Sequence, residues 1–159
     1  MTVSLALDNQ LCFKLYAASR AVTRAYKPML DPLGLTYPQY LVMLVLWEWH
    51  AAAPAHPTVK ALGERLMLDS GTLTPLLKRL EQLALVRRLR SARDEREVHL
   101  SLSESGEQLR DQAHALKTRL LCDSGIDLGQ ADALRSGLDQ LLQQIKDLSS
   151  SAPTDPAAR

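Results

Sequence analysis

The hydrophobic pattern changes once from a helical to a strand period, and this change most constrains the fold. In residues 97–102, apolar and polar side chains alternate strictly. A period of two is typical of a half-buried β-strand. Residues 86–91 are the predicted antiparallel partner, joined to it by a loop at 92–95. One small hairpin is therefore expected in an otherwise helical chain.

Two short helices are predicted before this hairpin. Residues 58–66 fit one helix, residues 67–71 a tight connection, and residues 70–83 a second helix with leucines at the i, i+3, i+4 and i+7 spacing (Leu73, Leu76, Leu77 and Leu80). Pro75 lies beyond the first turn, so a bend or a late helix start is expected there. Two short helices across a tight turn, followed by a hairpin, predict a winged helix-turn-helix over residues 58–102.

Helices are also predicted on both sides of this region, which makes the fold class mainly α with a small β-wing. A first helix is expected from an Asp8 N-cap to Lys27, and a second after the capping box of Thr36 and Gln39. Ser103 should begin a long helix that runs to Cys122.

A last helix is predicted from the cap at Asp127 to residue 148. Leucine stripes on the terminal helices favour a dimer built from residues 8–50 and 103–148. The tail, 149–159, is expected to be disordered.

Composition limits the remaining possibilities. With 159 residues, 46% of them hydrophobic and 23% charged, the chain is expected to form one soluble globular domain over residues 1–159. Two cysteines are too few for a disulfide-rich secreted protein, and we find neither a signal-like leader nor an apolar run near 18 residues. We therefore expect a cytoplasmic protein without a membrane partner. The histidines lack metal-site spacing, and no metal, cofactor or enzymatic activity is expected.

Basic residues are concentrated around the predicted wing. Residues 58–100 hold nine Lys and Arg against six Asp and Glu, and five of the arginines lie between positions 87 and 96. An all-helical packing module with an incidental hairpin would not explain these arginines. Because arginine suits phosphate contacts and narrow minor grooves, we expect binding to double-stranded operator DNA.

The second helix would enter the major groove with its polar face. Arg96 is the best candidate for the minor groove, and Asp94 could orient its guanidinium or serve ordinary turn chemistry. The expected DNA-binding residues are Ser70, Thr72, Thr74, Lys78, Arg79, Arg88, Arg90, Arg93, Asp94 and Arg96.

Cys12 is the most plausible reactive group of the chain. A free cysteine on an apolar stripe is more often a small buried hydrophobic residue. Here it lies near a helix N-terminus, where the helix dipole favours a thiolate. Tyr16, one turn further along, is a candidate to donate a hydrogen bond to that sulfur.

These motifs resemble a known family. The wing residues Asp94-Glu95-Arg96, followed by a strand and the helix start Leu102-Ser103-Glu104-Ser105-Gly106, resemble the MarR family of dimeric winged-helix regulators over about residues 8–148. The segments 68–81 (LDSGTLTPLLKRLE) and 11–16 (LCFKLY) are similar to its organic hydroperoxide resistance regulator branch.

The resemblance implies a repressor that releases its operator when organic hydroperoxide oxidises Cys12. It implies Tyr26 and Tyr37 as hydrogen-bond donors to the sulfur, and Cys122 as the resolving thiol of the two-cysteine type. One departure is Ala84, where the family often has glycine; a residue with a Cβ there would tighten or displace the helix end.

Two other functions are compatible with the sequence. A regulator of this family could instead be switched by reversible binding of a phenolic or other small organic ligand, with Cys12 lining the pocket. A thiol peroxidase is the third possibility, but it would leave the predicted wing unexplained. A small cellular thiol, in place of Cys122, could also resolve oxidised Cys12.

Overall fold

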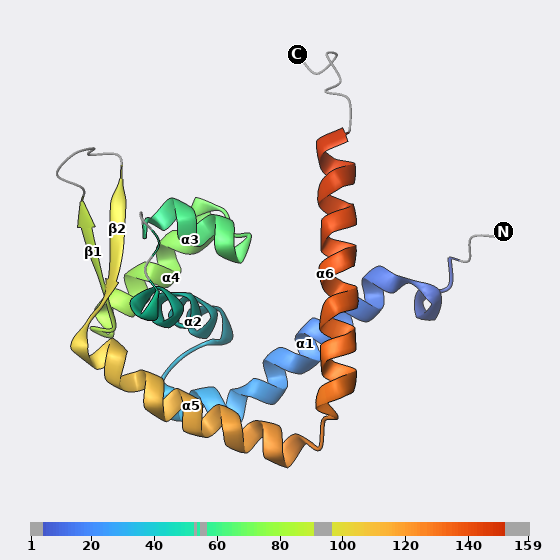
Figure 1. Cartoon of the computed structure of the whole chain (residues 1–159), viewed down its shortest axis with the longest axis horizontal. Helices are drawn as coiled ribbons and strands as arrows, with labels where there is room; N and C mark the ends of the chain where they lie inside the picture. Colours follow the sequence, from blue (N-terminus) through green and yellow to red (C-terminus); the bar gives the residue numbers. More distant parts are fainter. Residues whose placement is uncertain (1–4, 53, 55–56, 91–96, 152–159) are drawn as a thin grey trace. The chain divides into compact units, whose positions relative to one another are not determined.

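The computed structural model describes residues 5–52, 54, 57–90 and 97–151, and the side chains of 149–151 are not described. The elements follow one another as α1 (Leu11–Leu30), α2 (Tyr37–Ala51), α3 (Val59–Leu66), α4 (Ser70–Gln82), β1 (Val86–Arg90), β2 (Val98–Leu102), α5 (Glu104–Ser124) and α6 (Leu128–Ser151) (Figure 1). The predicted mainly helical class with a two-stranded wing is confirmed. The chain divides into two compact units, residues 1–120 and 121–159.

The first helix begins two residues later and ends three residues later than predicted. Residues 7–9 form a 3-10 turn, so Gln10 rather than Asp8 is the N-cap of α1. The Asp8 carboxylate instead lies 3.6 Å from Lys14 Nζ. At the other end, the ion pair between Lys27 and Asp31 (2.7 Å) supports the last turn and extends the helix to Leu30.

Three other helices, α2, α5 and α6, begin at the predicted N-terminal capping residues. The Thr36 backbone N–H donates to Gln39 Oε1 at 2.8 Å, which forms the predicted capping box of α2. Ser103 Oγ accepts from the Gly106 N–H at 3.0 Å at the start of α5. Asp127 Oδ1 accepts from Gln130 N–H at 2.8 Å before α6, which continues to Ser151, beyond the predicted end.

The second short helix does not start late. Helix α4 begins at Ser70, where the Asp69 side chain caps its N-terminus, and it contains Pro75. Its end is not displaced by Ala84, which adopts a left-handed conformation (φ 56°). The Ala84 N–H donates to Glu81 O at 2.9 Å and the Leu85 N–H to Leu80 O at 3.0 Å, which is a Schellman motif with alanine in the glycine position.

The core of the first unit lies between α2, α3, α4 and the hairpin. The largest fully buried side chains are Val42, Met43, Leu62, Leu73, Leu77 and Leu80. Strands β1 and β2 pair antiparallel from Val86↔Leu102 to Arg90↔Val98. Trp47 Nε1 donates to Gly106 O at 2.7 Å in the buried interior, which fixes α2 to the start of α5.

Candidate cysteine site and nucleic-acid interface

Helix α4 has the two faces that a recognition helix needs. Its predicted leucine stripe packs inward, with Leu73, Leu77 and Leu80 buried and Leu76 partly buried. The opposite face is exposed and holds the predicted DNA-binding residues Ser70, Thr72, Thr74, Lys78 and Arg79. The sequence therefore places these five side chains together on one solvent-facing surface of α4.

Two of the α4 hydroxyl groups are held by hydrogen bonds near the start of the helix. The Thr72 N–H and hydroxyl both donate to the Asp69 carboxylate at 2.9 Å. These two bonds hold the pKa of Asp69 below its usual value. Thr74 Oγ1 donates to Ser70 O at 2.7 Å. Both hydroxyl oxygens can still accept hydrogen bonds, and their positions are fixed relative to the helix.

The predicted wing arginines do not all share one environment. Arg88 Nε donates to Glu81 Oε2 at 2.6 Å, and both side chains are about one-third exposed. This ion pair joins β1 to α4. Arg90 is exposed at the end of β1. Arg93, Asp94 and Arg96 lie outside the described residues.

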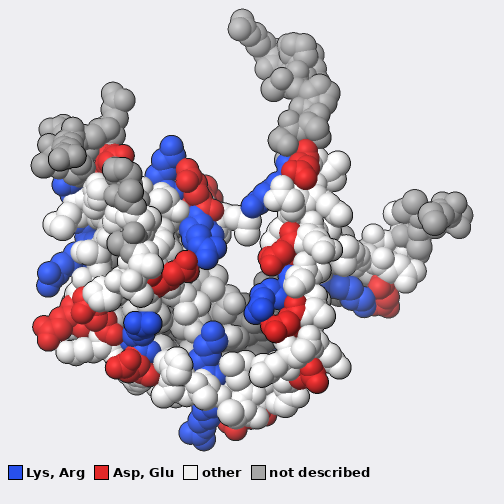
Figure 2. All heavy atoms as spheres, in the orientation of Figure 1, with Lys and Arg blue, Asp and Glu red and all other residues white. Residues whose placement is uncertain are grey.

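Charge is mixed rather than segregated on the visible surface. Figure 2 shows Lys and Arg interspersed with Asp and Glu over the face it draws. This agrees with a formal net charge of only +1 for the whole chain. Contact with DNA phosphates would therefore depend on particular side chains of α4 and the wing rather than on the overall charge.

Cys12 is the second residue of α1, and its thiol is free and exposed. The predicted position in the first turn of a helix is confirmed. Tyr16 lies one turn further along and is 58% exposed. Its hydroxyl accepts a hydrogen bond from Arg20 Nη1 at 3.2 Å, and the guanidinium lies 5.6 Å from the centre of its ring.

Tyr26 and Tyr37 belong to an aromatic cluster that also includes Tyr40. Their ring centres are 5.3 Å apart in an edge-to-face arrangement, and Tyr40 lies 6.0 Å from Tyr26. Burial and the neighbouring Tyr26 raise the pKa of Tyr37. Burial, with Tyr26 and Tyr37 beside it, raises the pKa of Tyr40 to about 12. The hydroxyls of Tyr37 and Tyr40 therefore stay protonated at neutral pH and can act as donors.

The structure does not bring Cys12 together with this tyrosine pair in one chain. Cys12 and Tyr26 belong to the same continuous helix and are fourteen residues apart. At a rise of 1.5 Å per residue, that separation is about 21 Å. A hydrogen bond between Tyr26 and Cys12 thus requires a second copy of the chain.

Cys122 lies near the end of α5, and its thiol is also free and exposed. It belongs to the second unit, residues 121–159, whereas Cys12 belongs to the first.

Both ends of the chain present apolar side chains to solvent. Leu7, Leu11 and Val22 are exposed in or next to α1. On and around α6 the exposed apolar residues are Leu121, Ile126, Leu128, Leu134, Leu142, Ile145 and Leu148. Exposed apolar surface on this scale is typical of an association surface. None of the helices among the described residues is long and apolar enough to cross a membrane.

Sequence reasoning missed three contacts that shape these sites. They are the pairing of Arg88 with Glu81, the bond from Arg20 to Tyr16 and the bond from Trp47 to Gly106. The i, i+4 spacing of Tyr16 and Arg20 could have indicated the second of these. The other two join separate elements, and no local pattern signals them.

Known proteins similar to this chain agree with this architecture. Residues 24–113 match the family model described as transcriptional regulator SarA/Rot. The organic hydroperoxide resistance transcriptional regulator of Bacillus subtilis is 50% identical over 144 residues, which cover 89% of this chain and 92% of that protein. The regulator TtmR of Methylorubrum extorquens is 45% identical over 140 residues, covering 88% and 69% respectively.

Solved structures of AbfR of Staphylococcus epidermidis also match. One has a TM-score of 0.72 at 36% identity, over 89% of this chain and 94% of that one. AbfR has been solved bound to DNA in overoxidised (TM-score 0.71) and reduced (0.70) states. It has also been solved with a disulfide formed (0.59).

The family match covers more than half of the chain, and the Bacillus relative is matched over nearly its whole length. The chain belongs to the MarR family of winged-helix transcriptional regulators, in the organic hydroperoxide resistance branch.

Proposed function

We propose that this protein is a redox-sensing repressor that releases its operator when an organic hydroperoxide oxidises Cys12. The observation that carries this proposal is an exposed, free thiol in the first turn of α1, in a chain that also presents a recognition helix. The relative at 50% identity is an organic hydroperoxide resistance regulator, and AbfR has been solved in several oxidation states. The site of action is the operator, so the protein would work in the cytoplasm.

The chemistry begins with the Cys12 thiolate. Its sulfur attacks the terminal oxygen of the hydroperoxide, the O–O bond breaks, and the remaining alkoxide takes up a proton to leave as an alcohol. The sulfur is oxidised by two electrons to a sulfenic acid while the peroxide is reduced.

Tyr26 and Tyr37 of a second copy would donate hydrogen bonds to this sulfur, since Tyr26 of the same chain is about 21 Å away along the helix. The site would then be complete only in the dimer. Exposed apolar faces on α1 and α6 support such a dimer. Tyr16, one turn from Cys12, would lie at the edge of the same site.

Cys122 is the proposed resolving residue. Its thiol would condense with the sulfenic acid, which forms a disulfide and releases water. A disulfide requires Cα atoms within about 7 Å of each other, so any larger separation in the reduced dimer would force helices to move. Because the two recognition helices must match half-sites roughly 34 Å apart, such movement would weaken operator binding.

At the operator, Ser70, Thr72 and Thr74 would face base edges or phosphates, and Lys78 and Arg79 would anchor phosphates. Arg90 and the predicted Arg93 and Arg96 would serve the wing, with Asp94 orienting Arg96. Lys78→Gln should weaken binding to all sequences alike and reduce the salt dependence of binding.

Two serine variants test the switch. Cys12→Ser should bind operator DNA normally and remain bound after treatment with cumene hydroperoxide; release by this variant would refute the proposal. Cys122→Ser separates the two resolving routes. If it still releases fully, and only in the presence of a small thiol, the small thiol and not Cys122 resolves the sulfenic acid.

Mixed dimers test which subunit supplies the tyrosines. In one dimer, Cys12→Ser and Tyr37→Phe are on different chains, so the remaining Cys12 faces an intact Tyr37 of the partner. In the other, both substitutions are on the same chain, and the remaining Cys12 faces the phenylalanine. The first dimer should react with peroxide faster than the second. The reverse order would place the tyrosine in the same chain as its cysteine.

A further inference from the structure

The start of helix α4 presents side-chain oxygen atoms to solvent. Asp69 is the N-cap, Thr72 and Thr74 lie in the first two turns, and all three side chains are exposed. On the helix surface Gly71 lies between the two threonines, and it has no side chain that would hold the helix away from the floor of a groove. Because a recognition helix contacts base edges with its N-terminal residues, these oxygens are well placed to meet the bases.

The protons of both threonine hydroxyls are already used within the protein. Thr72 Oγ1 donates to Asp69 Oδ2 at 2.9 Å, and Thr74 Oγ1 donates to Ser70 O at 2.7 Å. A hydroxyl group has one proton and two lone pairs, so each oxygen can offer an outside partner only a lone pair. The bonds from Thr72 hold the pKa of Asp69 below its usual value, so its carboxylate is ionised at neutral pH and has no proton either. Asp69, Thr72 and Thr74 are therefore all hydrogen-bond acceptors and not donors.

Duplex DNA offers one kind of partner to such acceptors. Phosphate oxygens are themselves acceptors, and their negative charge is repelled by the Asp69 carboxylate. In the major groove the hydrogen-bond donors are the amino groups, N6 of adenine and N4 of cytosine. Every base pair has one of these groups, on one strand only, so an acceptor can tell the two strands of a pair apart. Phosphate contacts are left to the donors of Lys78 and Arg79, further along α4.

We infer that Thr72 reads the amino group of an adenine or a cytosine in the operator, and that Asp69 is the positioning residue that sets this preference. Asp69 acts through Thr72, because it holds the hydroxyl proton that would otherwise be free to bond a base oxygen or a purine N7. The inference rests on the proposed function and narrows one of its contacts, from base edges or phosphates to a single class of base atom. Thr74 is restricted in the same way, but Asp69 plays no part in that restriction.

Asp69→Asn reverses the polarity of Thr72 and keeps the helix cap. Asparagine is as good an N-cap as aspartate, and its amide oxygen can accept from the Thr72 N–H, which now bonds Asp69 Oδ1 at 2.9 Å. In place of Oδ2 it has an amide N–H, which donates to Thr72 Oγ1 and frees the hydroxyl proton for a partner outside the protein. The group that Thr72 recognises should then change from an amino group to a base oxygen or a purine N7.

The probe for the test is the duplex that the reduced full-length protein enriches from a randomised library. Two kinds of base analogue are placed in turn at each base pair of its half-site. One lacks the amino group (purine for adenine, pyrimidin-2-one for cytosine), and the other is a 7-deazapurine, which lacks the N7 acceptor. The readout is the factor by which each analogue weakens binding in fluorescence anisotropy. A general change in affinity, such as the effect of the charge lost in Asp69→Asn, cancels in this ratio.

At one position, loss of the amino group should weaken binding by the natural sequence roughly three- to tenfold, the contribution of one hydrogen bond. Thr72→Val should remove this factor, because valine keeps the shape of threonine but lacks the oxygen. Asp69→Asn should remove it as well and make binding at that position depend on the acceptor atoms of the pair. If Asp69 were merely a cap, Asp69→Asn would keep the factor, since both residues cap equally well.

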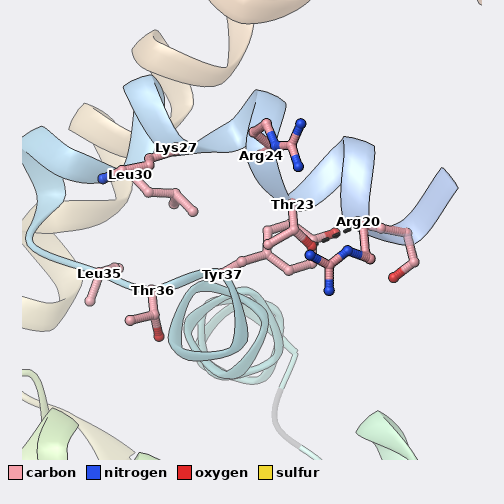
Figure 3. Close-up of a pocket in the computed structure, with 9 residues that line it drawn as sticks. Arg20, Thr23, Arg24, Lys27, Leu30, Leu35, Thr36 and Tyr37 are labelled. Carbon is pink, nitrogen blue, oxygen red and sulfur yellow. Dashed lines mark hydrogen bonds between the residues drawn. The ribbon is translucent and has the colours of Figure 1, made fainter. Parts of the chain in front are cut away.

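Three further measurements serve as controls. Thr72→Ser keeps the hydroxyl and should keep the factor. Thr23→Val removes a hydroxyl that donates to Ser19 O at 2.9 Å on α1 (Figure 3), in the same i, i−4 arrangement as that of Thr74, and should leave every factor unchanged. A position that depends on Thr74, identified with Thr74→Val, should keep its amino-group dependence in Asp69→Asn.

The inference is overturned if Thr72→Val leaves every factor unchanged, or if the position that depends on Thr72 responds to the 7-deazapurine and not to loss of the amino group. An amino-group factor that survives in Asp69→Asn would also overturn it. These outcomes leave the proposed function intact, provided that cumene hydroperoxide still releases the selected duplex. If the reduced protein enriches no duplex at all, the proposed function fails, and the inference fails with it.

Discussion

Replacement of Ala84 by glycine should stabilise the protein, although glycine adds no packing contact. Ala84 has a φ of 56°, a left-handed conformation that is unfavourable for a residue with a Cβ. The residue is exposed, so removing its methyl group should cost little packing. Its N–H and that of Leu85 close the Schellman motif at the end of α4. Glycine adopts the same conformation without strain.

The size of the effect follows from two opposing terms. An L-residue in the left-handed region costs about 1–2 kcal/mol. Glycine adds roughly 0.4–1 kcal/mol of unfolded-state entropy that folding must overcome. The net gain should therefore be about 0.5–1 kcal/mol, or a rise in Tm of about 1–4 °C for a chain of this size.

Urea unfolding followed by circular dichroism, with all variants at the same protein concentration, measures this gain. Ala115→Gly is the matched control, because Ala115 is an exposed alanine inside helix α5. There the same substitution should destabilise by about 0.5–1 kcal/mol. If Ala84→Gly destabilises the protein as Ala115→Gly does, the conformation assigned to the end of α4 is wrong.

Three further predictions concern contacts around the same framework. In Gly106→Ala the new Cβ would lie 2.2 Å from Leu85 O, so the start of α5 must shift, and the loss in a urea titration should exceed 1 kcal/mol, in the range of other overpacked sites. Glu81→Gln and Arg88→Gln should each destabilise, and the double variant should reveal a coupling of about 0.5–1 kcal/mol; additive effects would argue against the ion pair between α4 and β1. Because the pKa of Tyr40 is raised to about 12, its contribution to stability is fully present below about pH 10 and is lost as the pH rises from there to 12. Tyr40→Phe should flatten the fall in stability over this pH range, and an unchanged pH profile would contradict the assignment.

The sequence was sufficient for the elements whose patterns are local. Strict alternation at 97–102 and the leucine spacing of 73–80 depend only on which face of a strand or helix is buried. The strand is present at Val98–Leu102 with Leu100 and Leu102 buried, and the leucine stripe packs inward as predicted. The caps at Gln39, Ser103 and Asp127 are equally local, since each bond spans three residues.

Features that depend on competing partners were not predictable in this way. Asp8 could cap a helix or pair with Lys14, and only the three-dimensional structure shows the second outcome. Pro75 was expected to bend α4 or to delay its start, and the late start is wrong, since α4 begins at Ser70 after the Asp69 cap. The separation of Cys12 from Tyr26, by contrast, already follows from the predicted helix over 8–27, which contains both residues.

The pairing of Arg88 with Glu81 also depends on a partner that no local sequence pattern indicates. A basic residue near a predicted wing suggests a DNA contact, and its guanidinium is also bonded to Glu81 within the protein. The DNA contact of Arg88 stays a prediction. Lys78, Arg79 and Arg90 form no such ion pair with any residue that the structure describes, and their DNA contacts are proposals in the same way. In sequence alone, Arg88 and Arg90 cannot be distinguished.

The central claim is that oxidation of Cys12 and release of the operator are one event. The most direct test is to add cumene hydroperoxide in steps to the protein–operator complex. At each step, operator release is measured by fluorescence anisotropy, and the oxidised fraction of Cys12 by mass spectrometry of the same sample. The account predicts that the two fractions rise together and reach completion together. Complete release with Cys12 still reduced, or a complex that persists with Cys12 fully converted to a disulfide, would contradict it.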